Sequence, residues 1–326
     1  MRKRKNKKKH KKGRDWMRVV FMGTPDFAVG TLEALIKAGH QVEAVVTQPD
    51  KPKGRGKMMQ FPPVKEVALK YDIPVYQPLK VKEEAFQQVL NEIAPDVIVV
   101  VAFGQILPQS ILTLPKYGCI NVHASLLPKY RGAAPIQWAV IDGEKETGVT
   151  TMLMDEGLDT GDILKKVVVA LDKKETGGSL FDKLAQCGAQ LLIDTLVEVE
   201  NGTCTRTKQE EALSTYAKML NKKLGKIDFS KTAEEIERLI RGLNPWPSAY
   251  TIYNGKTLKI WDADVVEQEV DGEPGQVVEV NKKELLIKTG KGLLSLKELQ
   301  LEGKKRMEID AFLRGNQVEA GKILGK

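Results

Sequence analysis

The chain has 326 residues, of which 42% are hydrophobic, a size and composition typical of a soluble protein with one or two domains. No apolar run approaches the ~18 residues of a membrane-spanning helix, and no signal-peptide pattern follows the basic start. The three cysteines, which form no CxxC pair, are typical of reduced thiols, so we expect a cytoplasmic protein without membrane contact.

Residues 1–16, MRKRKNKKKHKKGRDW, explain the basic net charge. They carry ten Lys or Arg and one Asp, a formal charge of +9 against +8 for the whole chain, so the remainder sums to −1. Such a block cannot bury apolar groups, and we expect a disordered basic tail. It could bind nucleic acid, serve as a nuclear address or simply be solvated. Met17, where a strand pattern begins, is a candidate for the natural start.

Residues 17–204 alternate between strand and helix patterns, which predicts an α/β fold with a doubly wound, mostly parallel sheet. The run DVIVVVAF is rich in β-branched residues and is typical of a strand buried on both faces. The first turn, GTPDFA, keeps only one glycine of the dinucleotide-binding pattern GxGxxG, which argues against a dinucleotide site. We predict strands at 18–23, 41–48, 96–103 and 118–125, and helices at 24–39, 62–74, 82–95 and 179–199. Ser179 and Asp182 are predicted to form a capping box of the last helix.

The pattern changes after residue 204. Residues 205–222 are polar and are predicted to be a linker. Within 223–326, a helix should begin at a Thr232–Glu235 capping box and end at a proline, and NPWPSAYT (244–251) should break regular structure. Short alternating runs separated by Gly, Asn and Asp then predict a small β-barrel or sandwich.

Asn121 and His123 lie in the strand-like run GCINVHAS, in a chain with only three histidines. Residues two apart in a strand point to the same face, and at the carboxyl end of a parallel strand that face opens on the ligand crevice. An amide can stabilise an oxyanion, and an imidazole can move protons near neutral pH. A histidine satisfied within the core is an equally weighted alternative.

The segment MDEGLDTGD (154–162) concentrates carboxylates between two strand-like runs. It could be an acidic surface turn or a site for a hard cation. Alternatively, one of its carboxylates could orient His123 and stabilise the charged imidazole. A set of Asn, His and Asp side chains without a Ser or Cys nucleophile favours direct transfer, in which the substrate supplies the nucleophile.

The motifs NVHASLLPKYRGAAP and GLDTGD resemble the signature of folate-dependent formyltransferases. From Met17 onward, with FMGTPDFA and TQPDKPKGRGK, the chain is similar to the members that formylate methionyl-tRNA. The resemblance implies an enzyme that uses 10-formyltetrahydrofolate and methionine-charged initiator tRNA, without a metal or an obligate protein partner, and is compatible with a monomer. It also implies that the C-terminal domain is an OB-like β-barrel. It implies catalytic roles for Asn121, His123 and Asp159 and folate contacts from Ser125, Leu126, Leu127 and Pro128, with FGQILP (103–108) as a further wall of the folate pocket.

Four cations lie in residues 51–57, within QPDKPKGRGK, between prolines and glycines. A mobile solvated loop is one interpretation. The resemblance implies instead that this loop enters the acceptor stem of the tRNA, with Arg55 as a contact. The mildly basic C-terminal part would hold the tRNA backbone.

Two other functions remain open from the sequence. A formyltransferase acting on an amino-sugar nucleotide would share the trio but would not need the basic loop. A non-enzymatic dinucleotide- or RNA-binding protein is the alternative from another class, and its dinucleotide form is disfavoured by the incomplete glycine pattern.

Overall fold

The computed structural model describes residues 16–53 and 58–325 and divides the chain into two compact units, residues 1–121 and residues 122–326. This division falls inside the strand Cys119–His123, far from residue 204. The domain boundaries expected at residues 204 and 222 therefore stay predictions. Residues 1–15 of the basic tail and residues 54–57 of the basic loop lie outside the described part. In the described part, no helix has the length and apolar character needed to cross a bilayer.

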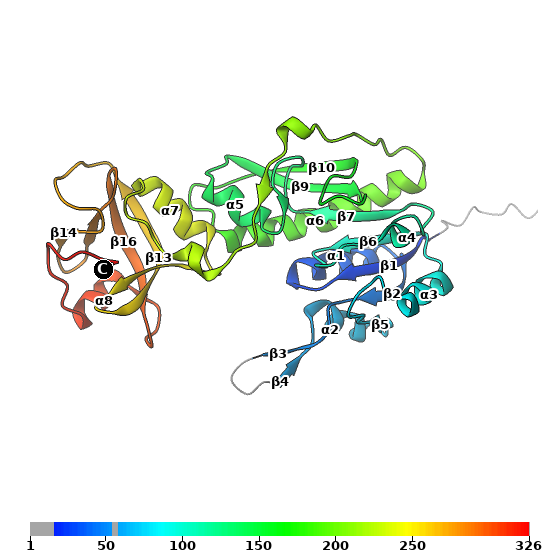
Figure 1. The fold of residues 1–326 in the computed structure, drawn as a ribbon, viewed down its shortest axis with the longest axis horizontal. Coiled ribbons are helices and arrows are strands. Elements are labelled where there is room, and N and C mark those ends of the chain that lie inside the picture. Colours follow the sequence, from blue (N-terminus) through cyan, green and yellow to red (C-terminus); the bar gives the residue numbers. More distant parts are fainter. Residues whose placement is uncertain (1–15, 54–57, 326) are drawn as a thin grey trace, which may run out of the picture. The chain divides into compact units, whose positions relative to one another are not determined.

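The first unit is built on parallel strands in the order β5-β2-β1-β6-β7 (Figure 1). A separate antiparallel ribbon, β3–β4, flanks the segment 54–57 and extends away from this sheet (Figure 1). The elements of the unit are β1 (Arg18–Gly23), α1 (Asp26–Lys37), β2 (Gln41–Val46), β3 (Lys51–Lys53), β4 (Met58–Gln60), α2 (Pro63–Lys70), β5 (Val75–Tyr76), α3 (Glu84–Ile93), β6 (Val97–Val101), α4 (Gln109–Leu112) and the start of β7 (Cys119–His123).

Apolar patterning explains these elements. All five residues of β6 are buried, as expected of a central parallel strand covered on both faces. In α1, the side chains of Phe27, Leu32 and Leu35 recur at helical spacing and are all buried. The predicted helices and strands of this region are confirmed, with ends that differ by a few residues.

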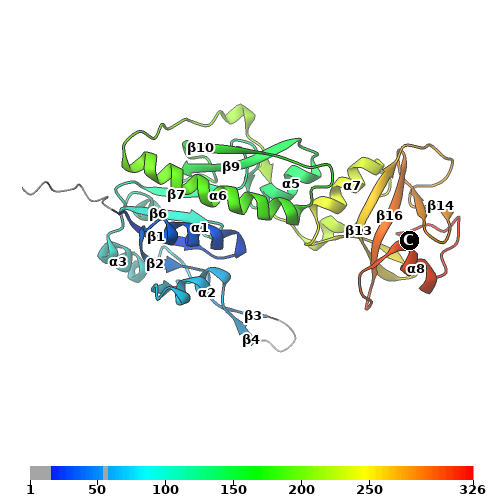
Figure 2. The same cartoon turned by 180° about the vertical axis from the view of Figure 1, so that it is seen from behind.

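The second unit begins within β7 and adds β9 (Glu146–Leu153) and β10 (Ile163–Ala170), so the sheet continues in the order β7-β9-β10. The β9–β10 pair is antiparallel, which makes the sheet mostly parallel rather than wholly so. The long helix α6 (Gly177–Glu200) runs along β9 and β10 (Figure 2). Between these elements lie β8 (Arg131–Gly132) and α5 (Pro135–Ile141).

The predicted N-cap of α6 was wrong by three residues. The cap is Thr176, whose hydroxyl accepts the Ser179 N–H at 3.0 Å, while the Ser179 hydroxyl accepts the Thr176 N–H. The first turn of the helix contains two glycines, Gly177 and Gly178. Gly177 is required there, because a Cβ would lie 2.4 Å from the Gly242 carbonyl oxygen.

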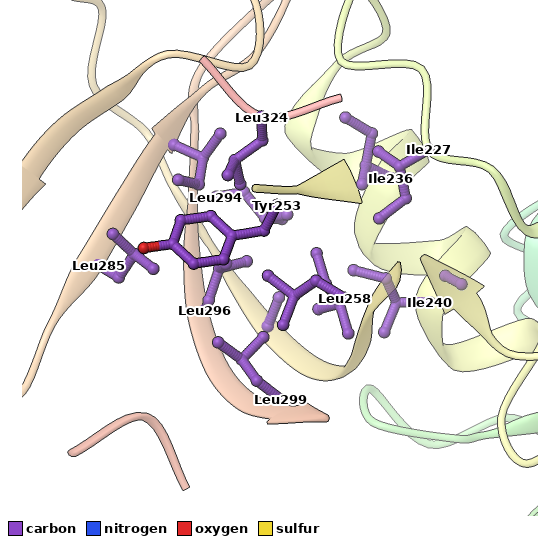
Figure 3. Close-up of a cluster of buried hydrophobic side chains, with 14 of the residues drawn as sticks. Ile227, Ile236, Ile240, Tyr253, Leu258, Leu285, Leu294, Leu296, Leu299 and Leu324 are labelled. Carbon is purple, nitrogen blue, oxygen red and sulfur yellow. The ribbon is translucent and has the colours of Figure 1, made fainter. Parts of the chain in front are cut away.

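The C-terminal region is an antiparallel β domain with strand order β12-β13-β16-β15-β14 and β17 paired to β16. Its apolar core contains Tyr253, Leu258, Leu294 and Leu296, with Ile236 and Ile240 from α7 packed against them (Figure 3). The elements here are η1 (Glu211–Leu213), β11 (Tyr216–Ala217), η2 (Lys222–Gly225), α7 (Ala233–Gly242), β12 (Ala249–Tyr253), β13 (Lys256–Val266), β14 (Val277–Val280), β15 (Leu285–Lys288), β16 (Leu293–Leu301), β17 (Met307–Glu308) and α8 (Ile309–Gly315).

Local signals in this region were mostly reliable. The Thr232–Glu235 capping box of α7 is confirmed, with the Glu235 N–H donating to the Thr232 hydroxyl at 3.1 Å and the Thr232 N–H donating to Glu235 at 2.9 Å. The break expected over 244–251 was too long, because residues 249–251 belong to β12. Their backbone groups pair with β13, a contact that is invisible in a local window.

We expect Leu296→Ala to lower the free energy of unfolding by ~2–5 kcal/mol, because it removes a fully buried side chain from this core. Denaturant unfolding followed by circular dichroism would measure the change. Leu213, which is 56% exposed, is the matched control, and Leu213→Ala should stay within about 0.5 kcal/mol of the parent. Equal losses in the two variants would contradict this description of the core.

Candidate active site

Strand β7 carries the asparagine and the histidine singled out in the sequence. Asn121 and His123 lie two positions apart on this strand, so their side chains leave it on the same side, and both residues are buried. The backbone of Asn121 pairs in parallel register with Val100 of β6. Both residues are therefore held by a strand with ladder partners, which restricts their motion.

The imidazole of His123 is held between two oxygen acceptors. Its Nε2 lies 2.9 Å from the carbonyl oxygen of Tyr130, and its Nδ1 lies 3.7 Å from the Oδ2 atom of Asp159. Because a carbonyl can only accept, the Nε2 atom must carry the proton of this hydrogen bond. The separation from Asp159 is too long for a direct hydrogen bond, so the carboxylate acts on the ring through its charge or through an intervening water.

Asp159 is the inward-facing carboxylate of the acidic segment 154–162. Asp155 and Glu156 are exposed, and Asp155 is engaged locally by the Thr160 hydroxyl at 2.6 Å. The side chain of Asp159 is only 13% exposed and faces His123. The segment thus exposes Asp155 and Glu156 at the surface and places Asp159 against His123.

A backbone amide fixes the Asp159 carboxylate. The N–H of Gly132 donates to Oδ2 at 2.8 Å, the same oxygen that faces the imidazole. Gly132 adopts a φ of +106°, and a Cβ there would lie 2.6 Å from the ring of Tyr216, so glycine is required at this position. A backbone N–H therefore helps to position the carboxylate.

The loop 125–128 is braced by the neighbouring strands. The hydroxyl of Thr150, on β9, donates to the Ser125 carbonyl at 2.6 Å and accepts the Leu127 N–H at 3.1 Å. The ammonium of Lys166, on β10, donates to the Leu127 carbonyl. One threonine and one lysine thus hold Ser125 and Leu127, two of the four residues for which folate contacts were predicted.

Two titratable groups beside this loop are shifted. Burial lowers the pKa of the Lys166 ammonium. Burial, together with the Glu144 and Asp142 carboxylates, raises the pKa of the Tyr130 phenol above its ordinary value. The Tyr130 hydroxyl therefore stays protonated, lies 2.9 Å from Glu144 and 3.0 Å from Asp142, and anchors the residue whose carbonyl faces His123.

Sequence reasoning missed several residues around this site. The Tyr130 carbonyl is a backbone group and has no sequence signal. Gln209 lies in the polar stretch interpreted as a linker, yet its side chain contacts the Asp159 backbone. Thr150 is one of three threonines in β9, ETGVTTML, and the local pattern does not distinguish it from the other two. Arg55, predicted to contact tRNA, lies outside the described residues.

Over residues 16–53 and 58–325, no three His, Cys, Asp or Glu side chains are grouped as ligands for a metal ion. What these groups supply is a pair of hydrogen-bonding side chains, Asn121 and His123, and a nearby negative charge on Asp159. Such an arrangement can stabilise an oxyanion and transfer a proton, the two requirements of acyl transfer.

Two family models match the chain. A model described as "Formyl transferase" covers residues 17–196, and one described as "Formyl transferase, C-terminal domain" covers residues 219–317. The first alone spans more than half of the chain, and the site residues of β7 and of the acidic segment fall within it.

Solved structures with a similar fold share only low sequence identity with this chain. WlaRD, a sugar 3N-formyl transferase, aligns with a TM-score of 0.65 and 22% identity over 89% of this chain and 99% of its own. The Helicobacter canadensis N-formyltransferase, in complex with folinic acid and dTDP-3-aminofucose, has a TM-score of 0.64 and 20% identity over 89% of this chain and 100% of its own. At these identities, the likeness shows the fold alone.

Curated relatives are far closer in sequence. The methionyl-tRNA formyltransferase of Lachnospira eligens is 63% identical over 95% of this chain and 100% of its own length. The corresponding proteins of Agathobacter rectalis and Clostridioides difficile are 61% and 51% identical, with 94% and 95% of this chain and 98% and 100% of their own lengths covered. The chain therefore belongs to the methionyl-tRNA formyltransferase family.

Proposed function

We propose that this chain transfers the formyl group of 10-formyltetrahydrofolate to the α-amine of methionine-charged initiator tRNA, giving N-formylmethionyl-tRNA for translation initiation. The observation that carries the proposal is the near full-length similarity to proteins named for this activity. The buried Asn121–His123 pair beside the Asp159 carboxylate supports it, because formyl transfer needs oxyanion stabilisation and a proton donor. A substrate of the translation machinery places the reaction in the cytoplasm.

The reaction begins when the neutral α-amine of the methionyl group attacks the formyl carbon. A model α-amine has a pKa of ~7.7–8.0, so a useful fraction is neutral at physiological pH. Attack forms the new C–N bond and places the negative charge on the formyl oxygen. The Asn121 amide and the Nδ1–H of the protonated His123 imidazole then stabilise this oxyanion by hydrogen bonds, because Nε2 is engaged by the Tyr130 carbonyl.

The tetrahedral intermediate collapses when the bond from carbon to N10 of the folate breaks. N10 leaves as a neutral amine only if it gains a proton, and His123 is the donor. The attacking amine loses a proton in the same sequence, which restores the histidine. Asp159 orients the imidazole and offsets the positive charge that it carries during transfer.

We assign folate contacts to Ser125, Leu126, Leu127 and Pro128. Their position directly after β7 places them next to His123 in the chain, and the contacts from Thr150 and Lys166 would keep this loop in one conformation when the pteridine binds. A preformed loop reduces the entropy lost on binding the donor.

The C-terminal β domain is proposed to be an OB-like, tRNA-binding domain that follows a linker at 205–222. Its mildly basic charge and its small antiparallel sheet suit backbone contacts with nucleic acid. The protein would act without an obligate protein partner.

Formylation assays with purified protein test this proposal directly. Radiolabelled 10-formyltetrahydrofolate would be offered with methionine-charged initiator tRNA, and separately with an amino-sugar nucleotide. We expect label in the tRNA fraction only. Transfer to the sugar nucleotide alone would assign the chain to the sugar-directed reaction, and an absence of transfer to either acceptor would favour a binding protein.

We expect Asn121→Ala and His123→Ala each to lower the rate of single-turnover formyl transfer by at least ~10²-fold, because each removes a hydrogen-bond donor of the transition state. Asp159→Asn should also be severely impaired, because a neutral amide cannot offset an imidazolium charge. Rapid-quench measurements with charged tRNA would report the rates. Near-normal turnover in any of the three would remove that residue from the mechanism.

Thr150→Val should weaken binding of the folate donor roughly 10- to 100-fold, because it leaves a buried N–H and a buried carbonyl of the 125–128 loop unpaired. Fluorescence titration with the folate would measure the dissociation constant. Thr203→Val, at an exposed threonine outside the loop, is the control and should match the parent. Unaltered folate affinity in Thr150→Val would show that the loop does not bind the donor.

Arg55→Ala should reduce kcat/KM for charged tRNA while leaving folate binding unchanged, since a guanidinium can bridge phosphates or stack on a base. Arg55→Lys should recover only part of the loss, because an ammonium lacks the planar fork. Kinetics over a salt series would separate this contact from general charge attraction. The assignment fails if Arg55→Ala retains parental kcat/KM at every salt concentration.

A further inference from the structure

The polar stretch before β11 reaches the loop that carries Asp159. The backbone of Thr207 exchanges two hydrogen bonds with Ile163, at 2.8 and 2.9 Å, at the end of the acidic segment. Two residues later, the side-chain amide of Gln209 donates to the carbonyl oxygens of Asp159 and Gly161, each at 2.8 Å. The polar stretch predicted to be a linker therefore makes hydrogen bonds to the loop that carries Asp159.

The Gln209 amide uses both its donor and its acceptor ends. While its NH₂ group binds the two loop carbonyls, its Oε1 accepts the Nε–H of Arg131 at 3.1 Å. The guanidinium of Arg131 is buried and also binds both carboxylate oxygens of Glu211, at 2.9 and 3.1 Å. Arg131 thus fixes the orientation of the Gln209 amide, and the amide in turn holds the two loop carbonyls.

These contacts close a ring around the catalytic carboxylate. Arg131 precedes Gly132, whose N–H donates to the Asp159 carboxylate, while Gln209, held by Arg131, binds the Asp159 carbonyl. Both the side chain and the main chain of Asp159 are therefore held in place by the two residues of strand β8, the side chain directly and the main chain through Gln209. The backbone of β8 pairs in turn with Tyr216 of β11, beyond Gln209 in the chain.

Asp159 needs such support because of its backbone conformation. Its φ is +54°, in the left-handed region, which is strained for an L residue although aspartate adopts it more readily than most. The carbonyl that Gln209 binds belongs to this residue. Loss of that hydrogen bond would let the peptide relax and would move the carboxylate away from the imidazole.

We propose that Gln209 is a positioning residue for formyl transfer, which holds the left-handed backbone of Asp159 so that its carboxylate faces Nδ1 of His123. The inference rests on the proposed function and adds to it a residue from outside the motif region. An amide is needed here because it alone among neutral side chains donates twice and accepts once in this geometry.

Gln209→Ala and Gln209→Glu test the proposal together. Both remove the two donors to the loop, while the carboxylate introduced by the second change would keep the size of the side chain and an acceptor for Arg131. We therefore expect kcat to fall roughly 10- to 100-fold in both variants, with KM for the folate and for charged tRNA within about 3-fold of the parent. Parental kcat in Gln209→Glu would overturn the proposal, since it would show that contact with Arg131 suffices.

Controls separate positioning from general stability. Gln190→Ala removes an exposed glutamine of α6 whose amide donates to Asp194 at 2.9 Å, away from the Asp159 loop, and it should retain full activity. Thermal unfolding of each variant would identify a collapse of the fold, and rates are then compared at a temperature where every variant is folded. A kcat loss that disappears under this condition would contradict a positioning role.

A double-mutant cycle with Asp159→Asn gives the sharpest result. If Gln209 acts through Asp159, Gln209→Ala should cost little more in an Asp159→Asn background than is already lost. Independent multiplication of the two losses would overturn the inference while leaving the proposed function in place. Full activity of Asp159→Asn alone would instead overturn the role proposed for Asp159.

Discussion

The side chain of His123 must be held in one orientation in a buried place, and most of the surrounding structure serves this requirement. A buried imidazole needs partners for its ring nitrogens, because an unpaired polar group away from water is costly. The Tyr130 carbonyl satisfies Nε2, and the Asp159 carboxylate lies across from Nδ1. Neither acceptor lies on β7, so the geometry of the histidine depends on segments that fold against that strand.

Each acceptor is itself constrained by a larger element. Tyr130 is anchored through its hydroxyl, whose raised pKa keeps it a donor, and this anchor limits the movement of the residue whose carbonyl faces His123. Asp159 is fixed by the Gly132 amide and, as we infer, by Gln209. Hydrogen bonds thus hold the two loop residues, Tyr130 and Asp159, against a histidine that lies on β7, an arrangement that preorganises charge and donors before the substrate binds.

Local and periodic features were predictable from the sequence, whereas contacts between distant segments were not. The β6 run and the Thr232 capping box depend on neighbouring residues and were identified correctly. The start of α6 was missed because Gly177 is required by the approach of Gly242, which is distant in the sequence. The resemblance to known formyltransferases singled out Asn121, His123 and Asp159, but neither residue type nor spacing indicated that Gln209 would bind the Asp159 loop.

The tautomer of His123 tests the central claim most directly. Uniformly ¹⁵N-labelled histidine in the protein gives few signals, because the chain contains three histidines, and His123→Ala identifies the relevant one. Long-range ¹H–¹⁵N correlation spectra report which ring nitrogen carries a proton. We predict a protonated Nε2, hydrogen-bonded to Tyr130, whether or not Nδ1 is also protonated. A neutral ring protonated only at Nδ1 would contradict the account.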